Sequence, residues 1–148
     1  MLVAILLNLI FRIGVRKVQN FVLPAGRVDP VALEQFMAEN GASWGARRDV
    51  IEHASFNLTQ SIETISEGCD PQEPLEITAS FDEFSLDVRV SYTGKPLELP
   101  EQRPTNEEIL ATEDGQRRLA GYMLRRYADQ VSATNKSGRS TIHFHFDH

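Results

Sequence analysis

The sequence is poor in cysteine and in positive charge, and it lacks a long hydrophobic run. Its 148 residues include one cysteine, Cys69, which excludes an internal disulfide and any metal site built from several cysteines. Asp and Glu number 21 against 15 Lys and Arg, and the net charge of −6 argues against a nucleic-acid partner. No segment is repeated or of low complexity, so most of the chain reads as one globular domain.

The most apolar segment is Met1–Phe11, whose sequence is MLVAILLNLIF. As a helix it would reach about 16 Å, which is too short for a hydrocarbon core about 30 Å thick. The basic residues Arg12, Arg16 and Lys17 follow this segment, whereas in a signal peptide they would precede it. Basic residues after an apolar run are typical of the cytoplasmic exit of a transmembrane helix. We therefore expect residues 1–17 to end such a helix, with the remaining chain at the cytoplasmic face of the inner membrane.

The same segment has a second interpretation. An N-terminal helix with an apolar stripe can dock on its own domain, or on a second copy of the chain. In that case the protein self-associates through Leu2–Phe11. In either case we expect something to cover these apolar side chains.

Residues 18–148 contain three segments with helical periodicity. Asp29 followed by Pro30 is a helix start, and Asn40–Gly41 is a helix stop. A longer segment repeats apolar residues every three or four positions and ends at Gly68. The predicted helices run from Pro30 to Asn40, from Arg47 to Glu67, and from Gln116 to Ala128, the last one after a capping box at Thr105–Glu108.

Apolar residues alternate with polar ones in the other ordered segments, which predicts strands with one buried face. The predicted strands are Val18–Leu23, Leu75–Phe81, Phe84–Tyr92, Val131–Ala133 and Ser140–Phe146. The element order β-α-α-β-β-loop-α-β-β predicts an α+β fold, a two-layer sandwich. We expect one mixed, mostly antiparallel sheet with all helices on a single face.

Three short motifs occur within these elements. The long helix contains HASFN (His53 to Asn57), the second strand of the first hairpin ends in SYTGK with Gly94, and the late helix contains Gly115 and Gly121. With the element order, these motifs resemble the ATP-binding domain shared by histidine kinases, gyrase-type enzymes and anti-sigma-factor serine kinases. The resemblance covers residues 18–148.

In that family the long helix carries a Glu and, four residues later, an Asn that holds magnesium. A strand-end Asp reads the adenine amino group, and a glycine-rich helix start holds phosphate. The resemblance implies that His53, Asn57, Gly94, Gly115 and Gly121 form the nucleotide site. However, His53 replaces the Glu, and the adenine-reading Asp is missing. The resemblance therefore implies the fold without catalysis and without a cofactor, with Mg-ATP binding as the alternative.

Longer stretches resemble a second family. They read ILLNLIFRIGVRK, SFDEFSLDVRVSYTGKPLELPEQRPTNEEI, DGQRRLAGYMLRRYAD and HFHFDH. They are similar to the cytoplasmic C-terminal region of bacterial xanthine/uracil permeases, the nucleobase:cation symporters. The resemblance implies that the chain follows a transporter's membrane helices, which bind the nucleobase. The chain itself contains none of those helices.

His143 and His145 are candidate metal ligands, because alternation in a strand places both side chains on one face, about 7 Å apart. The alternative is a solvated sheet face without metal, since the sequence reveals no ligand to complete a site.

Three functions follow from these patterns. The first is a non-catalytic regulatory or interaction domain of a nucleobase permease. The second is a serine kinase of the anti-sigma-factor type. The third is a sensor whose pocket around Asn57, Gly94 and Gly115 binds a nucleotide or nucleobase.

Overall fold

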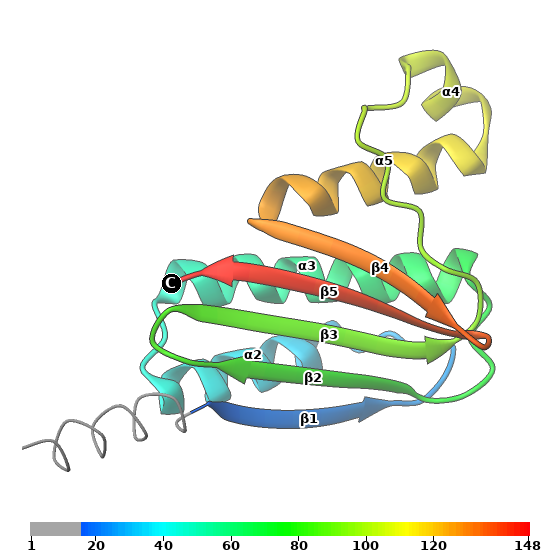
Figure 1. Ribbon diagram of the computed structural model, residues 1–148. Coiled ribbons are helices and arrows are strands. Elements are labelled where there is room, and N and C mark those ends of the chain that lie inside the picture. Colours follow the sequence, from blue (N-terminus) through cyan, green and yellow to red (C-terminus); the bar gives the residue numbers. More distant parts are fainter. Residues whose placement is uncertain (1–15) are drawn as a thin grey trace, which may run out of the picture.

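The computed structural model describes residues 16–148, which form a sheet with helices packed against one face (Figure 1). The sheet has five strands in the order β1-β2-β3-β5-β4, and every neighbouring pair is antiparallel. The two-layer α+β architecture is as predicted, but the sheet is fully antiparallel rather than mixed. The strands are β1 (Lys17–Leu23), β2 (Leu75–Phe81), β3 (Ser85–Thr93), β4 (Gln130–Lys136) and β5 (Arg139–Asp147).

Four helices lie in the described part of the chain, and their starts follow the capping signals of the sequence. Asp29 accepts a hydrogen bond from the Ala32 amide ahead of Pro30, and Thr105 forms the predicted capping box with Glu108. The helices are α2 (Pro30–Trp44), α3 (Arg48–Gly68), α4 (Asn106–Ala111) and α5 (Glu113–Tyr127).

The core forms between α3 and the inner face of the sheet. The apolar stripe of α3 consists of Ala54, Leu58, Ile62 and Ile65, and each of these residues is fully buried. The alternate residues of β2, β3 and β5 face this stripe, because successive side chains of a strand point to opposite faces. Burial of this one face fixes the register of the sheet, since a one-residue slip would expose it.

Helix α2 is longer than predicted. The helix continues through Asn40–Gly41 and ends at Trp44, with Gly45 in the left-handed conformation as its cap. Gly41 serves helix packing instead, because a Cβ there would lie 2.6 Å from Cγ1 of Ile51 on α3. The Trp44 ring stacks on Phe81 with ring centroids 5.9 Å apart, which anchors the turn between α2 and α3 to the sheet.

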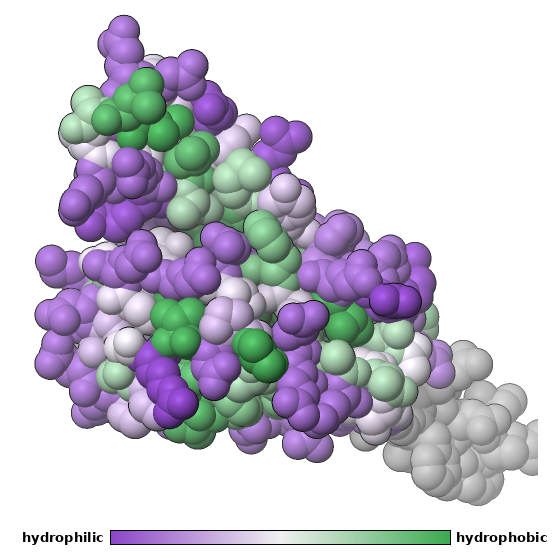
Figure 2. Space-filling model, turned by 180° about the vertical axis from the view of Figure 1, so that it is seen from behind, coloured by the Kyte–Doolittle hydropathy of each residue, from purple (hydrophilic) through white to green (hydrophobic). Residues whose placement is uncertain are grey.

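The α4 and α5 helices extend beyond the sheet at one end of the molecule (Figure 1). Thr112 caps α5 by accepting a hydrogen bond from the Gly115 amide, so this helix begins three residues before the predicted Gln116. Figure 2 shows the helical side, where polar residues predominate and apolar residues gather at the α4 end. Leu110 of α4 is 85% exposed.

None of the helices between residues 16 and 148 has the length and apolar character needed to cross a membrane. The predicted membrane segment within residues 1–17 lies almost entirely outside the described residues, as does the predicted self-association segment Leu2–Phe11.

The packing predicts a large stability difference between two leucine substitutions. Leu58→Ala leaves a cavity in the fully buried core, so we expect a loss of about 2–5 kcal/mol in the free energy of unfolding. The matched control Leu110→Ala removes an exposed side chain from a helix and should change it by less than about 0.5 kcal/mol. Urea unfolding followed by circular dichroism measures both, and equal effects would contradict the described core.

Candidate functional site

Asn57 lies in the interface between α3 and α5. Its side chain is fully buried, and Nδ2 donates a hydrogen bond of 3.3 Å to the Leu124 carbonyl. Leu124 belongs to the last turn of α5, where carbonyl groups have no backbone donor from a following turn. Asn57 therefore caps the C-terminal end of α5, and α5 covers it. Its Oδ1 atom is buried and has no hydrogen-bond partner among the described residues.

His53 lies one helical turn before Asn57, but on the outside of the molecule. Its ring contacts Tyr127 at the end of α5, with ring centroids 6.4 Å apart. Phe56 also packs on Tyr127, edge to face, at 5.0 Å. His53 thus belongs to an exposed aromatic cluster, whereas Asn57 is buried.

The three predicted glycines lie at close backbone contacts elsewhere. A Cβ on Gly94 would lie 2.5 Å from the Cys69 carbonyl, at the C-terminal end of α3. Substituting Gly115 would cause overlap with the Glu108 carbonyl, and substituting Gly121 would cause overlap with the Glu98 carbonyl. Each glycine therefore lets two backbone segments approach one another.

The predicted nucleotide residues consequently fall into separate groups. His53 and Asn57 lie near the end of α5, whereas Gly94 lies beside Cys69, near the start of α5. Roughly 22 Å of helix separates His53 from Gly68. The two helices run antiparallel, because Gly68 lies against the side chain of Arg117 near the start of α5.

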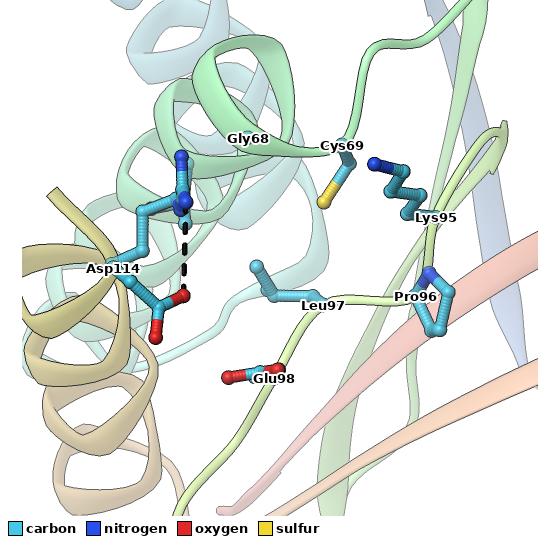
Figure 3. A pocket seen from close by; sticks show the side chains of 9 residues that line it. Gly68, Cys69, Lys95, Pro96, Leu97, Glu98 and Asp114 are labelled. Atoms are coloured by element: carbon cyan, nitrogen blue, oxygen red, sulfur yellow. Dashed lines mark ion pairs between the residues drawn. The ribbon is translucent and has the colours of Figure 1, made fainter.

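A cavity of about 250 Å³ lies where the C-terminal end of α3, the segment after β3 and the start of α5 meet. Cys69 and Lys95 lie on one side of it, Asp114 lies on the opposite side, and Leu97 points into the space between them (Figure 3). Gly94 and Gly115 are direct neighbours of lining residues. The cavity is therefore adjacent to two of the five predicted positions.

The charged groups of the cavity balance one another. Two cations, Lys95 and Arg117, are matched by two carboxylates, Glu98 and Asp114, and an Arg117 Nη2 atom lies 3.7 Å from Asp114 Oδ1. Polyphosphate sites require an excess of donors and positive charge. This lining suits a small ligand that carries both donors and acceptors.

The Cys69 thiol and the neighbouring Tyr92 hydroxyl are uncharged at neutral pH. Burial raises the pKa of the Cys69 thiol, although the hydrogen bond to Tyr92 opposes this. Burial also raises the pKa of Tyr92, whose hydroxyl donates a hydrogen bond of 2.7 Å to the Lys95 carbonyl. Since the thiolate is the reactive form, we expect Cys69 to react slowly.

His143 and His145 share the outer face of β5, as predicted, but both contact a carboxylate of the neighbouring strand. His143 Nε2 lies 2.7 Å and His145 Nδ1 2.9 Å from the same oxygen, Asp87 Oδ1. Within residues 16–148, no group of three or more His, Cys, Asp and Glu side chains is arranged to hold a metal ion. The sequence analysis found no further group beside His143 and His145. The structure shows Asp87 there, and it forms ion pairs with both histidines.

The charged cavity residues Lys95, Glu98, Asp114 and Arg117 were not predicted from the sequence, although Lys95 follows Gly94 and Asp114 precedes Gly115. One feature of the sequence points to Asp87 as a partner of the histidines. It is a charged residue in a strand of alternating apolar residues, opposite His145 once β3 and β5 are paired.

Comparison with known proteins identifies a similar fold. A chain in the crystal structure of the SiaB–SiaC complex from Pseudomonas aeruginosa matches with a TM-score of 0.55 at 10% sequence identity. The match covers 100% of this chain and 98% of that chain. At this identity the likeness establishes the α+β fold alone. No family model matches the sequence, and no curated protein is similar to it, so these comparisons give the permease resemblance no support.

The contacts of Asn57 predict a role in stability. Asn57→Ala removes the donor of the buried Leu124 carbonyl, so we expect the free energy of unfolding to fall by about 1–3 kcal/mol. Asn20→Ala is the control, because Asn20 makes its side-chain hydrogen bond at the exposed surface, and it should cost less than about 0.5 kcal/mol. Urea unfolding measures both. An Asn57→Ala protein as stable as the wild type would show that the cap is unimportant.

Proposed function

We propose that this chain is a non-catalytic regulatory or interaction domain. The observation that carries the proposal is the buried position of Asn57. The ATPase resemblance assigns this residue to magnesium. In the structure Asn57 lies beneath α5, and its amide donates a hydrogen bond to the carbonyl of Leu124 in that helix. A nucleotide that used Asn57 would first have to displace α5, at the cost of the packed interface between the two helices.

Two further observations support the proposal. The cavity beside Cys69 has balanced charges, which does not favour a triphosphate with its magnesium ion. The chain of similar fold comes from a complex of two proteins, which is consistent with a domain that acts by binding a partner.

The proposal includes a location. The sequence resemblance to xanthine/uracil permeases, together with Met1–Phe11 and the basic residues after it, supports attachment to the cytoplasmic face of the inner membrane. In that position the domain would act on a transporter of nucleobases. The membrane part would bind the transported substrate, and this chain would bind a regulator or partner.

A second candidate function is a small-ligand sensor, which the cavity of about 250 Å³ favours. Its donors and acceptors suit a nucleobase better than a whole nucleotide. The only cysteine of the sequence lines this cavity, so alkylation of Cys69 reports on its occupancy without interference from other thiols.

Calorimetry separates these functions. We expect no saturable heat when the chain is titrated with Mg-ATP or ADP, because the site around Asn57 is closed. Saturable Mg-ATP binding with phosphate transfer would overturn the proposal in favour of a kinase.

The same titration with xanthine and uracil tests the sensor. Saturable binding that also slows alkylation of Cys69 would establish it. Binding without an effect on Cys69 would place the ligand outside the cavity.

Vesicle sedimentation tests the location. With phosphatidylethanolamine/phosphatidylglycerol vesicles at pH 7, we expect the chain to sediment because its apolar segment enters the interface. A variant without residues 2–11 should stay in the supernatant. If the intact chain also stays in solution, membrane attachment through this segment is wrong.

A further inference from the structure

The outer face of the sheet carries a cluster of charged groups around a single carboxylate. The Asp87 side chain is only 6% exposed, although no described helix covers this face (Figure 1). Neighbouring side chains cover it instead. Since a buried carboxylate is costly unless it is paired, these neighbours decide whether Asp87 can remain charged there.

Both oxygens of Asp87 are engaged, and by different parts of the chain. His143 and His145 contact Oδ1, while the Arg16 guanidinium is paired with Oδ2. Arg16 also donates from Nε to the Ser80 hydroxyl at 3.1 Å. Arg16 immediately precedes β1, so this ion pair ties the entry of the chain into the domain to the middle of the sheet.

The position of His145 favours its protonated form. Its Nδ1 lies 2.9 Å from Asp87 Oδ1, and its Nε2 lies 3.0 Å from Asp147 Oδ1. A neutral imidazole has one N–H, so it can donate to only one of these carboxylates, whereas the imidazolium donates to both. The hydrogen bond to Asp87 raises the pKa of His145, burial opposes this, and Asp147 raises it further. Protonation of His145 therefore places a second full positive charge beside the carboxylate that holds Arg16.

We propose that Asp87 is a proton-dependent clasp for the N-terminal entry of the domain, in which protonation of His145 weakens the hold on Arg16. The two cations compete because each one reduces the attraction of the shared carboxylate for the other, and because they repel one another. Linkage makes the effect reciprocal. A bound Arg16 must lower the proton affinity of His145 as much as the proton lowers the attachment of Arg16.

The other groups around Asp87 leave this competition in place. Ser80 and Ser85 are neutral, and Gln130 and Ser132 pair with the two histidines from β4. Arg89 pairs opposite His143 and adds positive charge. The charged and titratable groups around Asp87 are Arg16 ahead of β1, Arg89 on β3, and His143, His145 and Asp147 on β5. Glu76 and Arg139 lie on the same face and pair with one another.

The clasp differs from a purely structural ion cluster in the sign of its pH dependence. The pKa of His145 is raised on folding, so its contribution to stability is full below about pH 6.5 and is lost as the pH rises through the folded value. Burial raises the pKa of Asp87, but the hydrogen bonds from His145 and His143 outweigh burial and lower it. The Asp87 contribution is thus present above about pH 3.8 and is lost as the pH falls further.

The cluster accordingly stabilises the fold most in mildly acidic solution, where the clasp on Arg16 is weakest. In a purely structural cluster, the contribution to stability and the strength of the Arg16–Asp87 contact would rise or fall together with pH.

Histidine titration by NMR on the full chain tests the proposal. We expect Arg16→Gln to raise the pKa of His145 by about half a unit, because one competing cation is removed. The control Arg139→Gln removes an arginine of the same sheet face that pairs with Glu76 at 2.8 Å, and should leave this pKa unchanged. An unchanged or lowered pKa of His145 in Arg16→Gln would overturn the proposal.

A second measurement follows Arg16 itself in the wild-type protein. The heteronuclear NOE of its Nε–H group should be lower at pH 5 than at pH 7, because protonated His145 loosens the arginine. In Asp87→Asn the value should be low at both pH values. An Arg16 signal that is equally ordered at pH 5 and pH 7 would also overturn the clasp, whether or not Asp87→Asn folds.

Discussion

The packing of α3 between the sheet and α5 is the constraint on which the other features depend. One side of this helix is an apolar stripe that the sheet buries. A second side carries small and polar residues and faces α5. It consists of Asn57, Ser61, Thr64 and Gly68. Because these side chains are small, α5 approaches closely and fills the region above Asn57. The cavity beside Cys69 lies at the other end of α3.

This arrangement explains why Asn57, a predicted nucleotide-binding residue, lies away from the cavity beside Cys69. The sequence resemblance assigns Asn57 to magnesium, whereas in the structure its amide satisfies a carbonyl group of α5. Gly121 has a similar explanation, since it allows the segment after β3 to cross α5 at Glu98. Arg125 then fixes that segment by donating to the Leu99 carbonyl at 2.7 Å. Gly121 and Arg125 thus hold the segment after β3 against α5, and the cavity between them and α3 depends on these contacts.

Local sequence patterns predicted the fold well where one face of an element is buried. The periodicity of α3 and the alternation in β2 and β3 are direct consequences of that burial, so each was visible without tertiary information. The end of α2 was predicted wrongly. Asn40–Gly41 has the sequence of a helix stop, but the missing side chain of Gly41 lets Ile51 pack closely against α2. The extent of β4 was also underestimated. Its residues are mostly exposed on both faces, so they show no alternation.

The candidate sites were harder to predict because they depend on register rather than on spacing. His143 and His145 were identified from their alternation, but Asp87 lies 56 and 58 positions away from them along the chain. Only the pairing of β3 with β5 brings the three residues together. The same holds for the cavity, where Cys69, Lys95 and Asp114 come from three segments. Sequence spacing alone cannot show such neighbours.

The strand order has a consequence for the way the chain can fold during synthesis. β5 follows all the other strands in the sequence, yet it lies inside the sheet, between β3 and β4. Until β5 has left the ribosome, β4 has no strand partner, and one edge of β3 is unpaired. The histidines that contact Asp87 emerge with β5, whereas Arg16 pairs with Asp87 of β3 directly, so that ion pair does not depend on β5. Completion of the sheet, and with it of the cluster around Asp87, is therefore a late event of folding.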